Sequence, residues 1–114
     1  MSEGHKHILG ERLNEILGLV ALELKRHFPV ARVVLFGSYA RGDWDSESDI
    51  DILILTSRPM PRPERHLITD YIWEVNLKYG TNFTTLVVEQ EAWDKGRLRS
   101  LPLRGTILKE GVAL

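Results

Sequence analysis

Residues 33–56 read VVLFGSYARGDWDSESDIDILILT, two apolar runs separated by a polar loop. The runs predict buried strands over residues 31–37 and 49–56. Alternate residues of a strand point to the same side, so Asp49 and Asp51 are expected on one face with Leu53 and Leu55. Two carboxylates held together and partly desolvated are costly unless a cation neutralises them. The stretch therefore predicts a site for a positively charged ligand.

The composition is that of an ordinary globular protein. The 114 residues are 43% hydrophobic and 27% charged, which predicts one domain spanning residues 1–114. A formal net charge of −1 argues against general binding of nucleic acid or of an anionic membrane. Cysteine is absent, and no apolar run approaches the roughly 18 residues of a membrane span. We therefore expect a cytoplasmic protein.

Hydrophobic periodicity predicts three further helices and one further strand around these two strands. The expected order predicts an α/β (α+β) fold with a small mixed sheet and helices packed against it. The predicted elements are a helix over 11–27, strands over 31–37 and 49–56, a helix over 66–79, a strand over 81–89 and a helix over 103–110.

Three residues after the first strand have the chemistry of a phosphate site. Gly37 allows an open turn and close approach of the backbone to a ligand. Ser38 begins a helical turn, where unpaired N–H groups favour a phosphate, and its hydroxyl adds a donor. Arg41, one turn later, is placed to reach the phosphate tail or to stabilise a leaving group. Oxygen ligands such as Asp49 and Asp51 suit Mg²⁺ or Mn²⁺.

These residues together resemble a known family. GSYARGDWDSESDID is similar to the Gly-Ser, ten-residue spacer, Asp-x-Asp signature of the polymerase-beta-like nucleotidyltransferase superfamily. The ARG and SDID segments are typical of its smallest members, the minimal nucleotidyltransferase (MNT) domains. The resemblance implies the nucleotidyltransferase fold, nucleotide phosphates at Gly37 and Ser38, and Mg²⁺ on the catalytic pair Asp49 and Asp51.

The same resemblance implies an activity and a partner. Such proteins transfer a nucleoside monophosphate from a triphosphate to a hydroxyl group, with ATP or another NTP as donor. Minimal members often pair with a separately encoded all-helical HEPN protein, and some are antitoxins that attach AMP to a tyrosine of that partner. We therefore expect a nucleotidyltransferase that moves AMP from Mg-ATP to a HEPN-type partner.

One position departs from the family pattern. The family's third carboxylate stands on the strand after the long helix, but here the positions level with the aspartates hold Thr84 and Thr85. Glu89 and Glu91 are expected roughly 10–15 Å away, at about 3.3 Å per residue. The alternative hypothesis is a binding module that has lost catalysis and acts by holding its partner. Completion of the site by Asp70, by Glu74 or by a partner chain is a further alternative.

Two features stay open at the level of sequence. Trp44, in the polar loop, is placed to pack over that loop, to stack on a base or to meet a partner. Trp73 and Trp93 are assigned to core or subunit packing. Apolar residues on so small a domain indicate either self-association or a partner protein.

Overall fold

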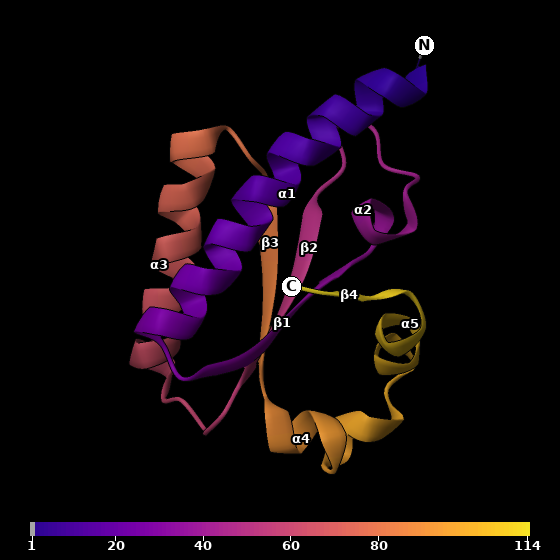
Figure 1. Cartoon of the computed structure of the whole chain (residues 1–114). Helices are drawn as coiled ribbons and strands as arrows, with labels where there is room; N and C mark the ends of the chain where they lie inside the picture. Colours follow the sequence, from indigo (N-terminus) through magenta and orange to yellow (C-terminus); the bar gives the residue numbers. More distant parts are fainter. Residues whose placement is uncertain (1) are drawn as a thin grey trace.

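The computed structural model describes the backbone of residues 2–114 and the side chains of residues 10–114 (Figure 1). Five α-helices, one 3₁₀ helix and four strands are assigned in this part of the chain. They are α1 (Ser2–His27), β1 (Val30–Phe36), α2 (Ser38–Arg41), β2 (Ile50–Thr56), α3 (Arg62–Tyr79), β3 (Phe83–Glu89), α4 (Gln90–Asp94), η1 (Arg97–Ser100), α5 (Pro102–Glu110) and β4 (Val112–Ala113).

The expected mixed α/β architecture is confirmed. The strand bounds differ by one or two residues from those expected, and three larger differences concern helices. Helix α1 begins at Ser2 rather than at residue 11. Helix α3 begins at Arg62 rather than at residue 66, because Pro61 precedes it and Pro63 lies in its first turn, where a missing N–H costs nothing. Residues 90–100, which lie outside the elements predicted from the sequence, contain α4 and η1.

The four strands form one sheet in the order β3-β2-β1-β4. Strands β1 and β2 are antiparallel, whereas β2 and β3 are parallel and are joined by the crossover helix α3. The two-residue strand β4 pairs with Val34 and Leu35 of β1. The end of β1, the start of β2 and the start of β3 therefore meet at one edge of the sheet.

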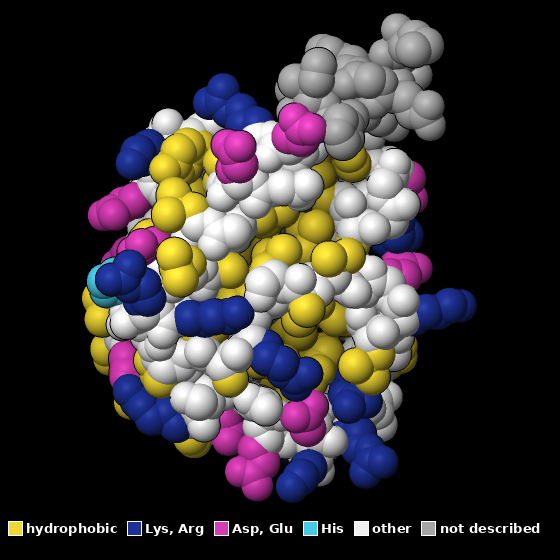
Figure 2. Space-filling view, viewed as in Figure 1, with side chains coloured by type: hydrophobic (Ala, Val, Ile, Leu, Met, Phe, Trp, Pro, Cys, Tyr) yellow, Lys and Arg dark blue, Asp and Glu magenta, His cyan; other side chains and the backbone are white. Residues whose placement is uncertain are grey.

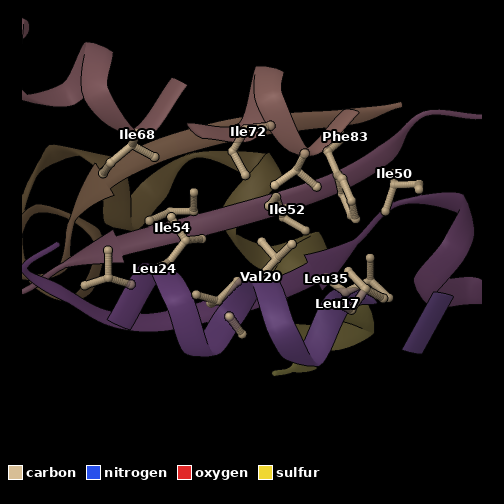
Figure 3. Packing of buried hydrophobic residues seen from close by; sticks show 14 of the residues in the cluster. Leu17, Val20, Leu24, Leu35, Ile50, Ile52, Ile54, Ile68, Ile72 and Phe83 are labelled. Atoms are coloured by element: carbon tan, nitrogen blue, oxygen red, sulfur yellow. The ribbon is translucent and has the colours of Figure 1, made fainter. Parts of the chain in front are cut away.

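The two sides of strand β2 are buried against different helices. Ile50, Ile52 and Ile54 pack with side chains of α1 and α3, and Figure 3 shows them lying between the two helices. Leu53 and Leu55 point the other way and pack with Trp93 of α4 and Ile107 of α5. Figure 1 accordingly shows α3 and α5 on opposite sides of the sheet. The alternation expected from the sequence is confirmed, and it places Asp51 on the side covered by α4 and α5.

Over residues 2–114, no helix combines the length and the apolarity needed to cross a membrane.

Candidate active site

Strand register brings the residues singled out in the sequence to one edge of the sheet. Phe36, the last residue of β1, pairs with Asp51 of β2, and Asp51 pairs on its other side with Thr84 of β3. Gly37 directly follows Phe36 in the chain and therefore also lies beside Asp51. The Gly-Ser turn and the Asp-x-Asp segment are therefore adjacent in space.

Gly37 lies in direct contact with the Asp51 carboxylate. Its φ of +78° belongs to a region that L side chains rarely adopt. A Cβ at this position would lie 3.3 Å from Asp51 Cγ and would collide with Asp51 Oδ2. Both the backbone conformation and the contact therefore require glycine here. The absent side chain is what lets the turn close onto the aspartate.

Two neutral side chains, one on β3 and one just before it, donate hydrogen bonds to the two aspartates. Thr84 donates a hydrogen bond from Oγ1 to Asp51 Oδ1 at 2.6 Å. Asn82, just before β3, donates from Nδ2 to Asp49 Oδ1. Neither contact was foreseen from the sequence, because both depend on the parallel register of β3. The second carboxylate oxygen of each aspartate, Oδ2, accepts no hydrogen bond from the described side chains.

The expected absence of a third carboxylate at this level of β3 is confirmed. Thr84 occupies the register position beside Asp51, whereas Glu89 pairs with Thr56 at the far end of both strands. Glu74 lines a groove between α1 and α3 with Leu19 and Tyr71, away from the aspartates. Among the described residues, no three acidic, histidine or cysteine side chains converge on a common point.

Ser38 opens the short helix α2, with Gly37 as the residue before it. Arg41 N–H bonds back to the Gly37 carbonyl at 3.1 Å, so the turn is helical from its first residue. The N–H groups of Ser38, Tyr39 and Ala40 have no acceptor within such a turn. The Ser38 hydroxyl and these N–H groups thus belong to the residues that directly follow Gly37. Gly37 itself lies beside the Asp51 carboxylate.

Arg41 is held by two carboxylates from different parts of the chain. Its Nε lies 3.1 Å from Asp43 Oδ2, and its Nη1 lies 3.3 Å from Glu110 Oε2. The hydrogen bonds to Asp43 and, secondly, to Glu110 raise the pKa of the Arg41 guanidinium above its ordinary value. Glu110 was not a sequence-predicted site residue. Its contact arises because β4, directly after α5, pairs with β1 and brings the end of α5 to the turn.

The loop between α2 and β2 is ordered by its own polar side chains. Ser48 accepts a hydrogen bond from Asp45 N–H at 3.0 Å and donates to Asp45 Oδ1 at 3.2 Å. Trp44 stacks face to face on Tyr39, with ring centroids 4.9 Å apart and an interplanar angle of 4°. Burial, and secondly the negative charge of Asp45, raise the pKa of Tyr39 above its ordinary value. Trp44 therefore covers the loop, one of the arrangements expected for it.

The residues present fit a divalent cation that arrives with a ligand. Mg²⁺ in nucleotide sites is bound through one or two carboxylates together with phosphate oxygens and waters. Asp49 and Asp51 supply two carboxylates beside a turn suited to phosphate. Two carboxylates are a small ligand set for a second ion, since paired-metal sites hold ions about 3.5–4 Å apart with bridging acidic groups. The donor set thus fits one divalent ion better than two.

Comparison with known proteins agrees with this arrangement. The family model described as a nucleotidyltransferase domain matches residues 17–114, which include the Gly-Ser turn and both aspartates. This chain belongs to the nucleotidyltransferase domain family. The expected resemblance is thereby confirmed at the level of the family.

Curated relatives of this chain come from archaea. Two Methanocaldococcus jannaschii proteins, provisionally named protein adenylyltransferases, are 41% identical over 59 residues and 37% identical over 75 residues. These matches cover 52% and 66% of this chain, and 60% and 70% of the relatives. The protein adenylyltransferase MntA of Thermococcus cleftensis is 41% identical over 44 residues, 39% of this chain and 44% of the relative. The chain thus spans only part of the length of these relatives.

Solved structures share the fold of this chain. A structure described as a minimal nucleotidyltransferase superposes with a TM-score of 0.58 at 23% identity, covering 95% of this chain and 94% of that one. A toxin–antitoxin structure with AMP-PNP gives a TM-score of 0.58 at 19% identity, covering 87% and 69% of the two chains. At these identities the likeness concerns the fold. The expected nucleotidyltransferase fold is confirmed.

Proposed function

We propose that this protein transfers an adenylyl group from Mg-ATP to a hydroxyl group of a protein partner. The single observation that carries the proposal is the contact between Gly37 and the Asp51 carboxylate. It joins a phosphate-binding turn to a pair of carboxylates in one site. The provisional names of the M. jannaschii relatives as protein adenylyltransferases support adenylyl as the group and protein as the acceptor.

In the proposed reaction, the acceptor hydroxyl oxygen forms a bond to the α-phosphorus of ATP. The bond between that phosphorus and the α,β-bridging oxygen breaks, pyrophosphate leaves, and the hydroxyl proton passes to solvent. The N–H groups of the α2 turn and the Ser38 hydroxyl hold the phosphate tail. Arg41 stabilises negative charge on the departing pyrophosphate.

Asp49 and Asp51 are the residues proposed to hold Mg²⁺ or Mn²⁺. The ion, when bound with the nucleotide, offsets phosphate charge and polarises the phosphoryl oxygens. Asn82 and Thr84 each occupy one oxygen of an aspartate, which fixes the direction of the other oxygen. The role of these neutral partners is therefore to orient the two carboxylates.

A surface for a protein acceptor is available on the described part of the chain. Several large apolar side chains are exposed, including Trp73 at 65% and Leu77 at 69% on α3. Trp73 is thus not a core residue, whereas Trp93 is buried at 2% exposure. Figure 2 shows apolar side chains in a recess near the centre of one face, with charged side chains mostly toward the rim. Such exposure is typical of proteins that bind a partner or a second copy.

The partner that we propose is a HEPN-type protein encoded beside this chain. Several solved structures with this fold are described as toxin–antitoxin structures, two of them as MntA–HpeT. Self-association through the same apolar residues is the alternative for this surface. Sedimentation of the purified chain, alone and with the neighbouring gene product, distinguishes the two.

The direct test is incubation with α-labelled ATP, Mg²⁺ and the neighbouring gene product. We expect label on a hydroxyl side chain of that product with the wild-type chain and none with Asp51→Asn. Glu47→Gln is the matched control, because it removes an exposed carboxylate of the loop that precedes Asp49. Equal labelling by wild type and Asp51→Asn overturns the proposed activity.

A second candidate function rests on Thr84. Threonine, not a carboxylate, stands beside Asp51. In this second candidate function the protein binds the nucleotide without transferring it and acts by holding its partner. This candidate predicts Mg-ATP binding without labelling, and partner binding that survives the double change Asp49→Asn/Asp51→Asn. Calorimetry with ATP and Mg²⁺, alongside the labelling experiment, separates it from the enzyme.

A further inference from the structure

Strand β3 forms one edge of the sheet, and the outer side of its backbone is open over most of its length. Asn82, just before β3, accepts a hydrogen bond from the first N–H of β2, so alternate residues after it also bond to β2. The backbone groups of Phe83, Thr85 and Val87 therefore point away from β2. Asn76 of α3 bonds both groups of Phe83, at 2.9 and 3.2 Å. Within residues 10–114, no other hydrogen bond reaches the outward backbone groups of Thr85 or Val87.

This edge lacks the usual protection against the addition of another strand. Native sheets guard an edge strand by keeping it short, or with charged residues, proline or a bulge. The strand at the opposite edge is short, because β4 has only two residues. In contrast, β3 has seven residues, carries neither charge nor proline from Phe83 to Val88, and pairs with β2 in an unbroken register. The edge of β3 can therefore accept a further strand.

A basic pocket of about 250 Å³ adjoins this edge, between α3 and β3 (elements labelled in Figure 1). It is lined by Arg62, Arg65, His66 and Thr69 of α3 and by Thr85 and Val87 of β3. No acidic residue lines the pocket, and neither arginine forms an ion pair within the described side chains. Glu64 of the same helix is instead held by Arg58, 2.8 Å away. The pocket thus presents basic side chains without a counter-charge beside an open backbone edge.

The basic pocket is separate from the candidate active site. Val87 packs with the core between α1 and α3, whereas Leu86 and Val88 pack on the side covered by α4 and α5. Asp51 shares the side of α4 and α5 and lies near the start of β2, whereas Arg62 follows the end of that strand. A ligand of the basic pocket therefore leaves the aspartates accessible.

We propose that the edge of β3 binds an extended acidic segment of a partner protein as an added strand. The outward backbone groups of Thr85 and Val87 hold the main chain of the segment, as in other cases of strand addition to a sheet edge. Side chains of neighbouring strands align on each side of a sheet. Acidic side chains of the segment on the α3 side therefore meet the basic residues of the pocket. Apolar side chains on the other side extend the apolar surface of Leu86 and Val88.

Two other occupants fit this edge less well. A second copy of β3 carries no acidic residue between Phe83 and Val88, so pairing of two such strands would leave the basic side chains unmatched. A single-stranded RNA matches the charge, but it has no peptide N–H and C=O groups to pair with the backbone of an edge strand. Charge and backbone together therefore favour an acidic polypeptide.

Fluorescence anisotropy on the full chain tests the proposal with a labelled, capped heptapeptide of alternating valine and glutamate. A heptapeptide of valine and lysine reverses the charge, and a fully N-methylated form of the acidic heptapeptide keeps the charge but cannot donate backbone hydrogen bonds. The protein variant is Arg62→Gln/Arg65→Gln. Arg97→Gln/Arg99→Gln is the matched control, because these two exposed arginines lie on η1, outside the pocket.

We expect the acidic heptapeptide to bind the wild type with a Kd below about 1 mM, and Arg62→Gln/Arg65→Gln to raise that Kd about tenfold through the loss of two exposed ion pairs. The control variant should leave the Kd unchanged, and the basic and N-methylated heptapeptides should not bind. The proposal is overturned if the acidic heptapeptide does not bind, if the N-methylated form binds equally well, or if the two double variants have the same Kd. Tighter binding of an octamer of uridylate than of the acidic heptapeptide also overturns it, and assigns the pocket to nucleic acid.

Discussion

Thr84 stands beside Asp51 in the sheet and donates a 2.6 Å hydrogen bond to it. A carboxylate at position 84 would face the same site, because paired residues of neighbouring parallel strands point to the same side. The hydroxyl instead takes up one lone pair of Asp51 and adds no negative charge. The residue at position 84 therefore sets how much negative charge the site offers to a cation.

Replacement of Thr84 by aspartate should create a stronger cation site. Without a divalent ion, Thr84→Asp should lower Tm, because two adjacent carboxylates repel each other. With Mg²⁺ or Mn²⁺, the rise in Tm should exceed that of the wild type, since binding to the native state adds stability. Thermal unfolding with and without each ion measures both effects. Thr84→Val is the control, and a Tm of Thr84→Asp that does not respond to either ion contradicts the prediction.

A methyl group at Gly37 should disrupt the site more than one at another glycine of similar conformation. Gly37 and Gly42 have φ values of +78° and +82°, but an added Cβ meets Asp51 only at Gly37, and nothing within 4 Å at Gly42. Gly42→Ala should therefore cost about 1–2 kcal/mol of unfolding free energy from the backbone alone. Gly37→Ala should cost more and abolish Mg-ATP binding.

Urea unfolding and calorimetry of the two alanine variants measure these differences. If Gly37→Ala binds Mg-ATP as tightly as Gly42→Ala does, the proposed closeness of phosphate turn and aspartate is wrong.

Loss of Arg41 should weaken nucleotide binding with little effect on folding. Arg41→Ala should raise the Kd of Mg-ATP by about tenfold, the usual effect of losing a hydrogen bond to a charged group. Glu110→Gln should give a smaller increase, because it releases one of two carboxylates that hold the guanidinium. Arg32→Ala serves for comparison, since Arg32 is an exposed arginine paired with Asp94, 3.3 Å away. A Kd unchanged by Arg41→Ala removes this residue from the site.

Truncating a buried side chain of β2 should lower the unfolding free energy far more than truncating an exposed side chain of α3. Ile52 has 0% exposure and is buried between α1 and α3, so Ile52→Ala should lower the unfolding free energy by about 2–5 kcal/mol. Leu77→Ala, at a side chain 69% exposed, should change it by about 0.5 kcal/mol or less. The urea midpoints of the two variants provide the comparison. Similar midpoints would contradict the assignment of β2 to the core.

Local patterns in the sequence were sufficient to predict the three longer strands and to single out Gly37, Ser38, Arg41, Asp49 and Asp51 as candidate site residues. Alternation along residues 49–56 separates the face of Asp51 from the face of Ile52, because the side-chain period of a strand is two residues. The nucleotidyltransferase signature in residues 37–51 implied that Gly37 and Asp51 belong to one site, and the register of β1 and β2 places them side by side. Both inferences rely on contacts between segments that are close along the chain.

Contacts between distant segments were decided by tertiary structure alone. Thr84 and Asn82 meet the aspartates through the parallel register of β3, which follows a long crossover helix. Glu110 reaches Arg41 because β4 pairs with β1 after most of the chain has intervened. A pocket that Leu13, Tyr39 and Asn82 help to line likewise assembles from α1, α2 and the turn before β3. Such contacts depend on how helices and strands pack in three dimensions, for which no local periodicity or motif in this sequence provides a signal.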